Sequence, residues 1–494
     1  MRIDRRGLLS LGVAGAMAGV VTRPASAQTP SAAPGPAVPP RAEPDHTIRI
    51  ASGLVELASD HIVSTKLYNG EFPGPMLRLR EGERVVVDIH NDTDTAEQLH
   101  WHGQRVPVEI DGAAEEGTPY IPAHGARRIS FTPGPAGLRF YHTHLTPGSD
   151  LNNGQYSGQV GTVYIEPKRE AGRYDREVFL VLKEFQPTLS RGGDMASDFL
   201  ANGAPIKSLV DTGESAMRAS MASGKPHGYE VGYELFSING RMLGHGEPIR
   251  VKQGERVMFH IVNGSATEIR SLALPGHRFE VVALDGNPVP KVTEVPLLWL
   301  GTAERISAIV EMKTPGIWVM GDIADDDRNK GMGIVVEYAG RTGKPKWIKP
   351  MPYRWDYTIF GRSDAAANPD ETFEMIFAKN NAALDGFNQW TINGTAFSME
   401  NMQPMFRLQH GGRYRLRMRN ASDDVHPLHL HRHSFELARI AGKATSGIIK
   451  DVVMLGGYQE VEVDFVADNP GRTLFHCHQQ LHMDFGFMAL FDYA

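Results

Sequence analysis

Cysteine is almost absent from the sequence, which has one, Cys477, in 494 residues. A single thiol cannot form a disulfide within the chain, so the fold must be held together without internal cross-links. A sole thiol is more consistent with chemistry, such as metal binding, than with a structural role. The alternative is an ordinary buried cysteine, since free cysteines are commonly core residues.

The sequence also lacks a membrane-length apolar run, an excess of positive charge and long helical periodicity. The apolar stretch at 8–21 is too short and too rich in Gly and Ala for a stable membrane span. The formal net charge is −7 with acidic and basic residues interspersed, so nucleic acid is not an expected partner. The 52 glycines and 32 prolines indicate short strands joined by turns.

The N-terminus has the features of a twin-arginine signal peptide at 1–27. An arginine pair at 5 and 6 precedes the short apolar run, and Ala-Ser-Ala at 25–27 ends it. The Pro- and Ala-rich segment 28–44 is expected to be an extended linker. These features predict the twin-arginine export machinery as a partner. They also predict a periplasmic or secreted protein with no membrane span after processing.

Three copies of one pattern occupy the rest of the chain. Each copy has Asn-Gly, then a strand-like stretch opening with Gly-x-Arg, then an Asn nine residues after that Gly. Val85, Val87 and Ile89 occupy alternate positions beside Arg84, Asp88 and His90, a pattern typical of a half-buried strand. A repeat of this length fits a whole β-sandwich. The sequence therefore predicts three domains, at 45–168, 172–342 and 350–494.

A segment at about 186–231 interrupts the second copy. It contains a plausible helix around Glu214 to Met221. The segment could be a lid, an interface or a long surface loop, and a surface loop is the expectation.

Four clusters of histidine occur among the twenty histidines, and all lie in the first and third repeats. Each cluster contains two histidines spaced by two. Because alternate side chains of a strand share a face, pairs from two domains can converge across an interface. The second repeat has no cluster and is expected to be a spacer without metal. The pairs are His100 and His102, His142 and His144, His429 and His431, and His476 and His478.

The run His476-Cys477-His478 offers ligands to two metal sites at once. Strand alternation directs Cys477 to one face and its neighbours to the other. One thiolate and two imidazoles are the ligand set of type 1 copper. Cys477 and His482 supply two of these ligands, and His426 supplies the third. The eight paired imidazoles suit three further copper ions.

Together these motifs resemble those of the multicopper oxidases, specifically three-domain laccase-like bacterial members, over essentially the whole mature chain. The resemblance implies an all-β fold of three tandem cupredoxin-like Greek-key β-sandwich domains. It implies four copper ions as cofactors: one type 1, one type 2 and two type 3. The implied ligands are His426, Cys477 and His482 for type 1; His100 and His429 for type 2; His102, His142 and His478 for one type 3 ion; and His144, His431 and His476 for the other.

The resemblance also implies a reaction, in which four one-electron oxidations of a donor are coupled to reduction of O2 to water. Electrons would enter at His482 and pass through Cys477. Asp111 matches the acid that delivers protons in the family, although an Asp before Gly is also common in turns. Met483 stands where several relatives have a second acid, so that donor is undetermined. Phe487 takes the axial place and cannot be a ligand.

The electron donor is the least determined part. A laccase would oxidise phenols or aromatic amines, whereas the alternative is a periplasmic oxidase of Cu(I) or another metal in copper tolerance. Met399, Met402 and Met405 could bind Cu(I), but loop or core packing is the commoner role of such residues. A third alternative is a cupredoxin scaffold without catalysis, which the complete ligand set weakens.

His433 lies close to the third cluster but is expected to be structural. The metal-free second repeat has His277 in the same setting, Gly-His-Arg-Phe-Glu against Arg-His-Ser-Phe-Glu. Arg432 and Phe140 replace the usual residues of these motifs, and the sequence offers no functional account of either.

Overall fold

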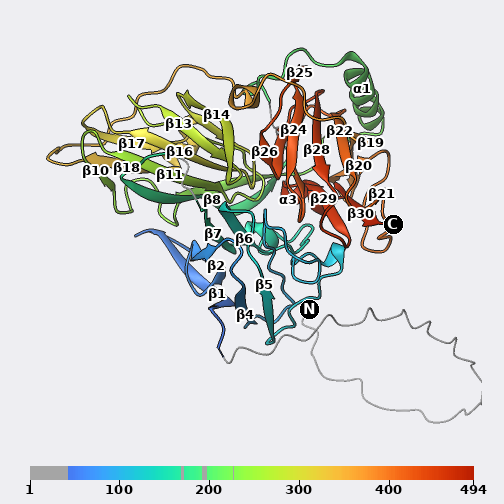
Figure 1. The fold of residues 1–494 in the computed structure, drawn as a ribbon, viewed down its shortest axis with the longest axis horizontal. Coiled ribbons are helices and arrows are strands. Elements are labelled where there is room, and N and C mark those ends of the chain that lie inside the picture. Colours follow the sequence, from blue (N-terminus) through green and yellow to red (C-terminus); the bar gives the residue numbers. More distant parts are fainter. Residues whose placement is uncertain (1–42, 169–171, 192–196, 226) are drawn as a thin grey trace, which may run out of the picture. The chain divides into compact units, whose positions relative to one another are not determined.

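The computed structural model describes residues 43–168, 172–191, 197–225 and 227–494 (Figure 1). The signal peptide and nearly all of the linker predicted from sequence lie outside the described residues. Residues Glu43–Ala494 form one compact unit. Among the described residues, the structure has no helix long and apolar enough to cross a membrane.

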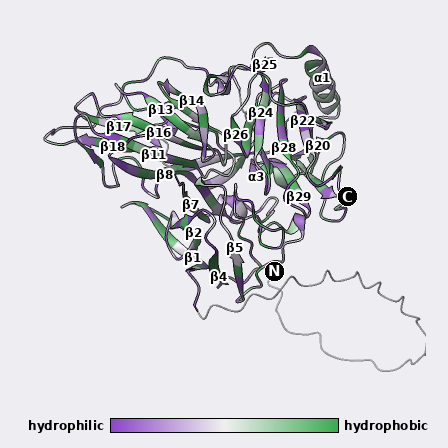
Figure 2. Cartoon of the chain, viewed as in Figure 1, coloured by the Kyte–Doolittle hydropathy of each residue, from purple (hydrophilic) through white to green (hydrophobic). Residues whose placement is uncertain are grey.

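The first repeat folds into two sheets, ordered β2-β1-β4-β5 and β3-β7-β6. In β4, Val87 and Ile89 are buried while Asp88 is half-buried, as the sequence alternation predicts. Figure 2 shows this alternation of hydrophobic and hydrophilic residues along the strands. The strands are β1 His46–Ala58, β2 His61–Tyr68, β3 Gly74–Arg80, β4 Val85–Asn91, β5 Ala126–Phe131, β6 Gly137–His142 and β7 Val160–Glu166.

The second repeat forms a sheet ordered β14-β13-β16-β11-β8-β9, with smaller sheets β10-β18-β17 and β12-β15. Its short helix α2 spans Asp325–Asn329. The strands are β8 Arg176–Ser190, β9 Glu230–Ile238, β10 Ile249–Val251, β11 Arg256–Asn263, β12 Arg270–Leu272, β13 Phe279–Leu284, β14 Asn287–Val295, β15 Leu298–Leu300, β16 Arg305–Glu311, β17 Ile317–Gly321 and β18 Gly333–Tyr338.

The third repeat forms sheets ordered β20-β19-β22-β28-β24-β25, with β26 on β24, and β21-β30-β29-β23-β27. Helix α3, Gln480–Asp484, follows β29. The strands are β19 Glu371–Leu384, β20 Phe387–Ile392, β21 Phe406–Leu408, β22 Arg413–Asn420, β23 His426–Leu430, β24 Phe435–Ile440, β25 Lys443–Ala444, β26 Ile449–Lys450, β27 Val452–Leu455, β28 Glu460–Val466, β29 Thr473–Cys477 and β30 Met488–Tyr493.

All three repeats are built from β-sheets, which confirms the predicted all-β class, and they share a four-strand order. These orders are β2-β1-β4-β5, β9-β8-β11-β16 and β20-β19-β22-β28. Each repeat has a first strand paired in parallel with the Gly-x-Arg strand: β1 with β4, β8 with β11 and β19 with β22. The repeated asparagine is buried in all three and donates from its amide to a carbonyl four or five residues later. These bonds are Asn91 to Thr95 at 2.8 Å, Asn263 to Glu268 at 2.9 Å and Asn420 to Asp424 at 2.7 Å. The asparagine therefore shapes the loop after this strand, which in the first and third repeats leads to a histidine pair.

The segment that interrupts the second repeat packs on the third domain. Helix α1, Lys207–Ala222, lies against β19 (Figure 1) and includes the helix expected from sequence. The Ile206 N–H donates to the Tyr458 carbonyl at 2.9 Å. A Cβ added to Gly213 would lie 2.6 Å from the carbonyl of Ala421, so the helix approaches the domain closely. The surface-loop prediction was therefore wrong, and the segment forms an interface.

Candidate metal centre

The four histidine pairs meet where the first domain contacts the third. His100 and His142 exchange backbone hydrogen bonds of 2.8 and 3.2 Å in the first domain. In the third domain, strand pairing places His429 opposite His476. All eight side chains are at most 1 % exposed. Two pairs from each domain therefore face one another in an interior from which solvent is excluded.

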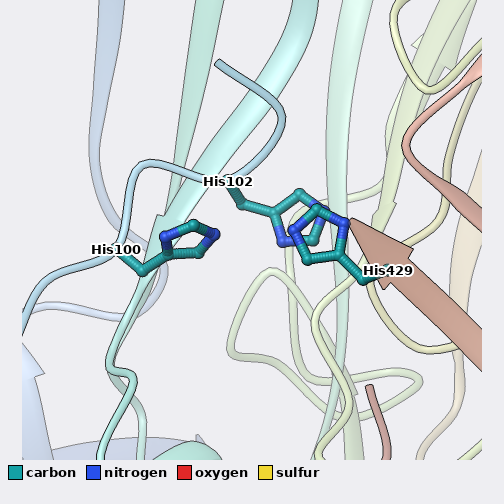
Figure 3. A group of neighbouring side chains, drawn as sticks. All are labelled: His100, His102 and His429. Carbon is teal, nitrogen blue, oxygen red and sulfur yellow. The ribbon is translucent and has the colours of Figure 1, made fainter. Parts of the chain in front are cut away.

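The rings come together in three groups that each combine both domains. In Figure 3, His100 and His102, on the loop after β4, point toward His429 of β23. The rings of His102 and His429 are stacked with centroids 3.8 Å apart. In each group, one nitrogen of every ring lies within 4.8 Å of the others. The groups are His100, His102 and His429; His102, His142 and His478; and His144, His431 and His476.

Backbone carbonyls hold several of these rings in one orientation. His142 Nδ1 lies 2.8 Å from the Thr143 carbonyl, and His429 Nδ1 lies 2.7 Å from the Asp451 carbonyl. A carbonyl only accepts, so each Nδ1 carries the proton and Nε2 keeps its lone pair. Within the described residues, His429 Nε2 has no hydrogen-bond partner. A buried nitrogen without a partner is costly unless it binds something.

Six of the eight paired imidazoles are held in the neutral form. Burial lowers the pKa of His429 well below its ordinary value, and the nearby rings of His476 and His100 lower it further. The same two causes act on most of the other paired histidines. A neutral imidazole is the form that binds a metal. The pKa is lowered well below the ordinary value for His102, His142, His431, His476 and His478 as well.

A fourth group lies within the third domain, on the other side of β29. Cys477 Sγ is 3.7 Å from His426 Nδ1 and 3.6 Å from His482 Nδ1. Burial raises the pKa of the Cys477 thiol and lowers that of His482 to about 3. The Trp390 ring packs 4.3 Å from the His482 ring, and the Phe487 ring 4.9 Å from that of His426. The group is enclosed by aromatic side chains.

Two methionines close to His482 in the sequence pack in a different cluster from the thiol. Phe487 belongs to the same core cluster as Cys477, whereas Met483 and Met488 pack with Leu474 in a separate cluster. His482 is only 2 % exposed. The side chain at which we expected electrons to enter is thus covered by protein.

Acidic side chains lie beside the histidines where the first and third domains meet. Asp111 Oδ2 accepts from His431 Nδ1 at 2.8 Å and lies 3.2 Å from His100 Nδ1. Burial acts to raise the pKa of Asp111, but His100, Glu116 and Arg432 together outweigh it and the pKa is lowered overall. Burial, reinforced by the Asp111 charge, raises the pKa of Glu116 well above its usual range. Glu115 Oε2 lies 3.4 Å from His144 Nδ1.

Our sequence analysis missed Glu115, Glu116 and a third acid, Asp451. Asp451 Oδ1 lies 3.1 Å from His102 Nε2. A signal was present, because Lys450 and Asp451 interrupt an apolar run, 448–455, that reads as a buried strand. Charged residues in such a run are buried only when they are paired.

The structure also accounts for three residues set aside in the sequence. His433 bonds the His431 carbonyl at 3.0 Å and the Tyr493 hydroxyl at 2.9 Å. His277 has the same kinds of partner, the Pro275 carbonyl and the Tyr338 hydroxyl, which confirms a structural role. Arg432, at φ 58°, donates to the carbonyls of Val106 in the first domain and Pro470 in the third. Phe140 packs 4.4 Å from the His102 ring.

The donor atoms in both places fit copper. A thiol with two imidazoles is the set that type 1 copper takes, and clusters of neutral imidazoles suit copper generally. Several ring nitrogens of the histidine cluster, such as His100 Nε2 and His429 Nε2, lack hydrogen-bond partners among the described residues.

Comparison with known proteins agrees with this chemistry. Three family profiles described as multicopper oxidase match residues 51–170, 207–338 and 368–494. The multicopper oxidase MmcO of Mycobacterium tuberculosis is 27% identical over 100% of this chain and 97% of its own. Laccase-2 of Fomitopsis schrenkii is 23% identical over 86% of this chain and 85% of its own. The crystal structure of a multicopper oxidase from Pseudomonas thermotolerans aligns with a TM-score of 0.65 and 25% identity, covering 91% of this chain and 98% of that one. The chain therefore belongs to the multicopper oxidases, copper-dependent oxidoreductases that use O2 and a reductant.

Proposed function

We propose that this protein is a laccase-type enzyme that holds four copper ions and oxidises phenols or related organic donors. The observation that carries the proposal is the convergence of eight buried imidazoles from two domains next to a buried Cys-His-His group. In this assignment His426, Cys477 and His482 hold type 1 copper; His100 and His429 hold type 2; His102, His142 and His478 hold one type 3 ion; and His144, His431 and His476 hold the other.

Bound copper would supply one-electron chemistry at the thiol group and a place for O2 reduction among the imidazoles. The chain joins the two places, because Cys477, the last residue of β29, is covalently linked to its neighbours His476 and His478, which belong to the imidazole groups. The aromatic walls keep water from the thiol. Similarity to a laccase over most of the chain supports an organic donor.

Asp111 is proposed to deliver protons during water formation, because its carboxylate contacts both His100 and His431. Replacing Asp111 with Asn should lower turnover by about 100-fold or more, the usual contribution of a general acid, and leave the blue absorption intact. Steady-state O2 uptake and the visible spectrum measure the two effects. Asp464→Asn is the matched control, because Asp464 is equally buried but pairs with Arg415 on the far sheet. Unchanged turnover in the Asp111 variant would refute the assignment.

Metal analysis with an absorption spectrum tests the copper assignment. We expect four coppers per chain, a strong blue band and a near-ultraviolet shoulder. A colourless protein after copper loading would refute the proposal. Copper content without O2 uptake from any donor would instead indicate the scaffold alternative.

The burial of His482 favours a second candidate, an oxidase of a small metal donor such as Cu(I). A bulky ring cannot touch an imidazole that is 2 % exposed and covered by Trp390. Met402 and Met405 pack against two different core clusters, as expected for methionines with a packing role. O2 uptake with a phenolic donor and with Cu(I), measured side by side, decides between the two. We expect the phenol to sustain turnover, and turnover with Cu(I) alone would overturn the laccase assignment.

The N-terminal features support export by the twin-arginine route and a periplasmic or secreted location. Cleavage after residue 27, detected by N-terminal sequencing of protein from an exporting host, would test this.

A further inference from the structure

The second domain supplies none of the proposed copper ligands, but it contacts the residue beside them through a buried ion pair. Arg305, at the start of β16, donates to both carboxylate oxygens of Asp451, with Nη1 2.6 Å from Oδ1 and Nη2 2.5 Å from Oδ2. Both side chains are fully buried. A two-point contact of this kind fixes the orientation of a carboxylate as well as its position. The pair therefore fixes the Asp451 carboxylate relative to the second domain.

Asp451, which lies in the third domain, in turn contacts one histidine of the first domain and one of its own domain. Its Oδ1 lies 3.1 Å from His102 Nε2, although the two residues are 349 positions apart in the sequence. Its main-chain carbonyl accepts from His429 Nδ1 at 2.7 Å. The stacked rings of His102 and His429 are thus both oriented by the same residue.

The contact with Asp451 decides which nitrogen His102 offers to the cluster. A carboxylate only accepts hydrogen bonds, so His102 Nε2 carries the proton and Nδ1 keeps the lone pair. His142 has the opposite arrangement, with Nδ1 bonded to the Thr143 carbonyl. The free atoms, His102 Nδ1 and His142 Nε2, lie 3.4 Å apart. Without Asp451, His102 could take either tautomer.

Gly103, directly after His102, makes room for the ion pair. A Cβ at this position would lie 2.6 Å from Asp451 Oδ2 and 2.7 Å from Arg305 Nη2. The residue also has a φ of 75°, which side chains other than that of glycine rarely adopt. Both facts explain why glycine follows the histidine pair here.

The second domain supports the pair with further contacts. Asp285 Oδ1 accepts from the Arg305 N–H at 3.0 Å, and Asp285 Oδ2 accepts from the Asp451 N–H at 3.2 Å. Lys450 Nζ lies 2.9 Å from Asp285 Oδ2. Arg139 of the first domain lies 3.8 Å from Asp451. Buried charges in this network are therefore paired, and all three domains contribute to it.

We propose that Arg305 and Asp451 are positioning residues, through which the second domain sets the orientation of His102 and His429 for metal binding. The second domain is then more than the spacer expected from sequence. This inference rests on the proposed assignment of these two histidines to copper. Partners of metal ligands typically change metal affinity by about 10- to 100-fold when removed.

The test compares Arg305→Gln and Gly103→Ala with a control, Arg270→Gln. Arg270 is likewise buried in the second domain and ion-paired, at 2.5 Å to Asp327, but contacts none of the proposed ligands. Each full-length protein is stripped of copper and titrated with it while copper content, the blue band and the near-ultraviolet shoulder are followed. Thermal unfolding of the copper-free forms reports the structural cost of each substitution.

Arg305→Gln and Gly103→Ala are expected to weaken copper uptake at the histidine cluster by about 10- to 100-fold and to lose the near-ultraviolet shoulder. The blue band should remain, because its ligands do not contact Asp451. Arg270→Gln should be destabilised yet keep both signals. If Arg305→Gln does not fold, Arg305→Lys, which keeps the charge but not the two-point contact, replaces it with the same expectation.

Two outcomes would overturn this inference. One is wild-type uptake and shoulder in the Arg305 and Gly103 variants; the other is equal loss of both signals in the Arg270 control. Failure of the proposed function is distinguishable, because the wild-type protein itself would then bind no copper at the cluster.

Discussion

Replacing Cys477 with Ser is expected to abolish the blue absorption and to lower donor oxidation by more than about 100-fold. Even the partners of metal ligands change affinity or activity by about 10- to 100-fold, and Cys477 is itself the proposed thiolate. Its Sγ lies within 3.7 Å of both His426 and His482, and the sequence has no second thiol that could replace it. Visible absorption and O2 uptake measure the loss.

The fold should survive this substitution, because serine is close in size to cysteine and the eight paired imidazoles are untouched. The near-ultraviolet signal of the histidine cluster should therefore remain. His433→Asn serves as the matched control, since His433 is buried near the cluster but bonds only the His431 carbonyl and Tyr493. A blue Cys477→Ser protein with normal turnover would contradict the role of the thiol.

The copper-free protein is expected to lose stability steeply as the pH falls below about 6.5. Burial lowers the pKa of eight of the histidines proposed as ligands, to about 3 for His482. The other seven are His102, His142, His426, His429, His431, His476 and His478. These rings stay neutral in the folded state, whereas the unfolded chain binds protons below about pH 6.5. The unfolded state therefore gains protons and stability with falling pH, by up to roughly 1.4 kcal/mol per pH unit for each histidine.

With eight such histidines, the loss between pH 7.5 and 5.5 is on the order of 10 kcal/mol, comparable with the total stability of a typical domain. Denaturant midpoints of the copper-free protein at the two pH values measure it. His433, whose pKa is lowered to about 4, provides an internal check. His433→Asn should reduce the pH dependence by about one histidine's share, roughly 1 kcal/mol. Equal midpoints at both pH values would contradict the prediction.

Much of the site was predictable because strand geometry is local. Spacing by two puts His476 and His478 on one face and Cys477 on the other, and the structure separates them in this way. The repeated Asn-Gly and Gly-x-Arg patterns indicated three similar domains for the same reason. Each inference needed only the alternation of side chains along a strand.

The contacts between domains were not predictable in this way. The insertion before β9 looked like a loop, because its docking depends on the close approach of Gly213 to the third domain. Asp451 and Arg305 lie in different domains, and nothing in their sequence surroundings indicates that they meet.

The sequence by itself determined the ligand types, their spacing and the family, because motif chemistry and strand alternation act over a few residues. Only the tertiary structure decided that His482 is covered, that Glu115 and Glu116 join Asp111, and that the second domain reaches the cluster through Arg305. The physical reason is that these features depend on how buried surfaces of separate domains fit together. A charged side chain tolerates burial only where such a fit brings it a partner.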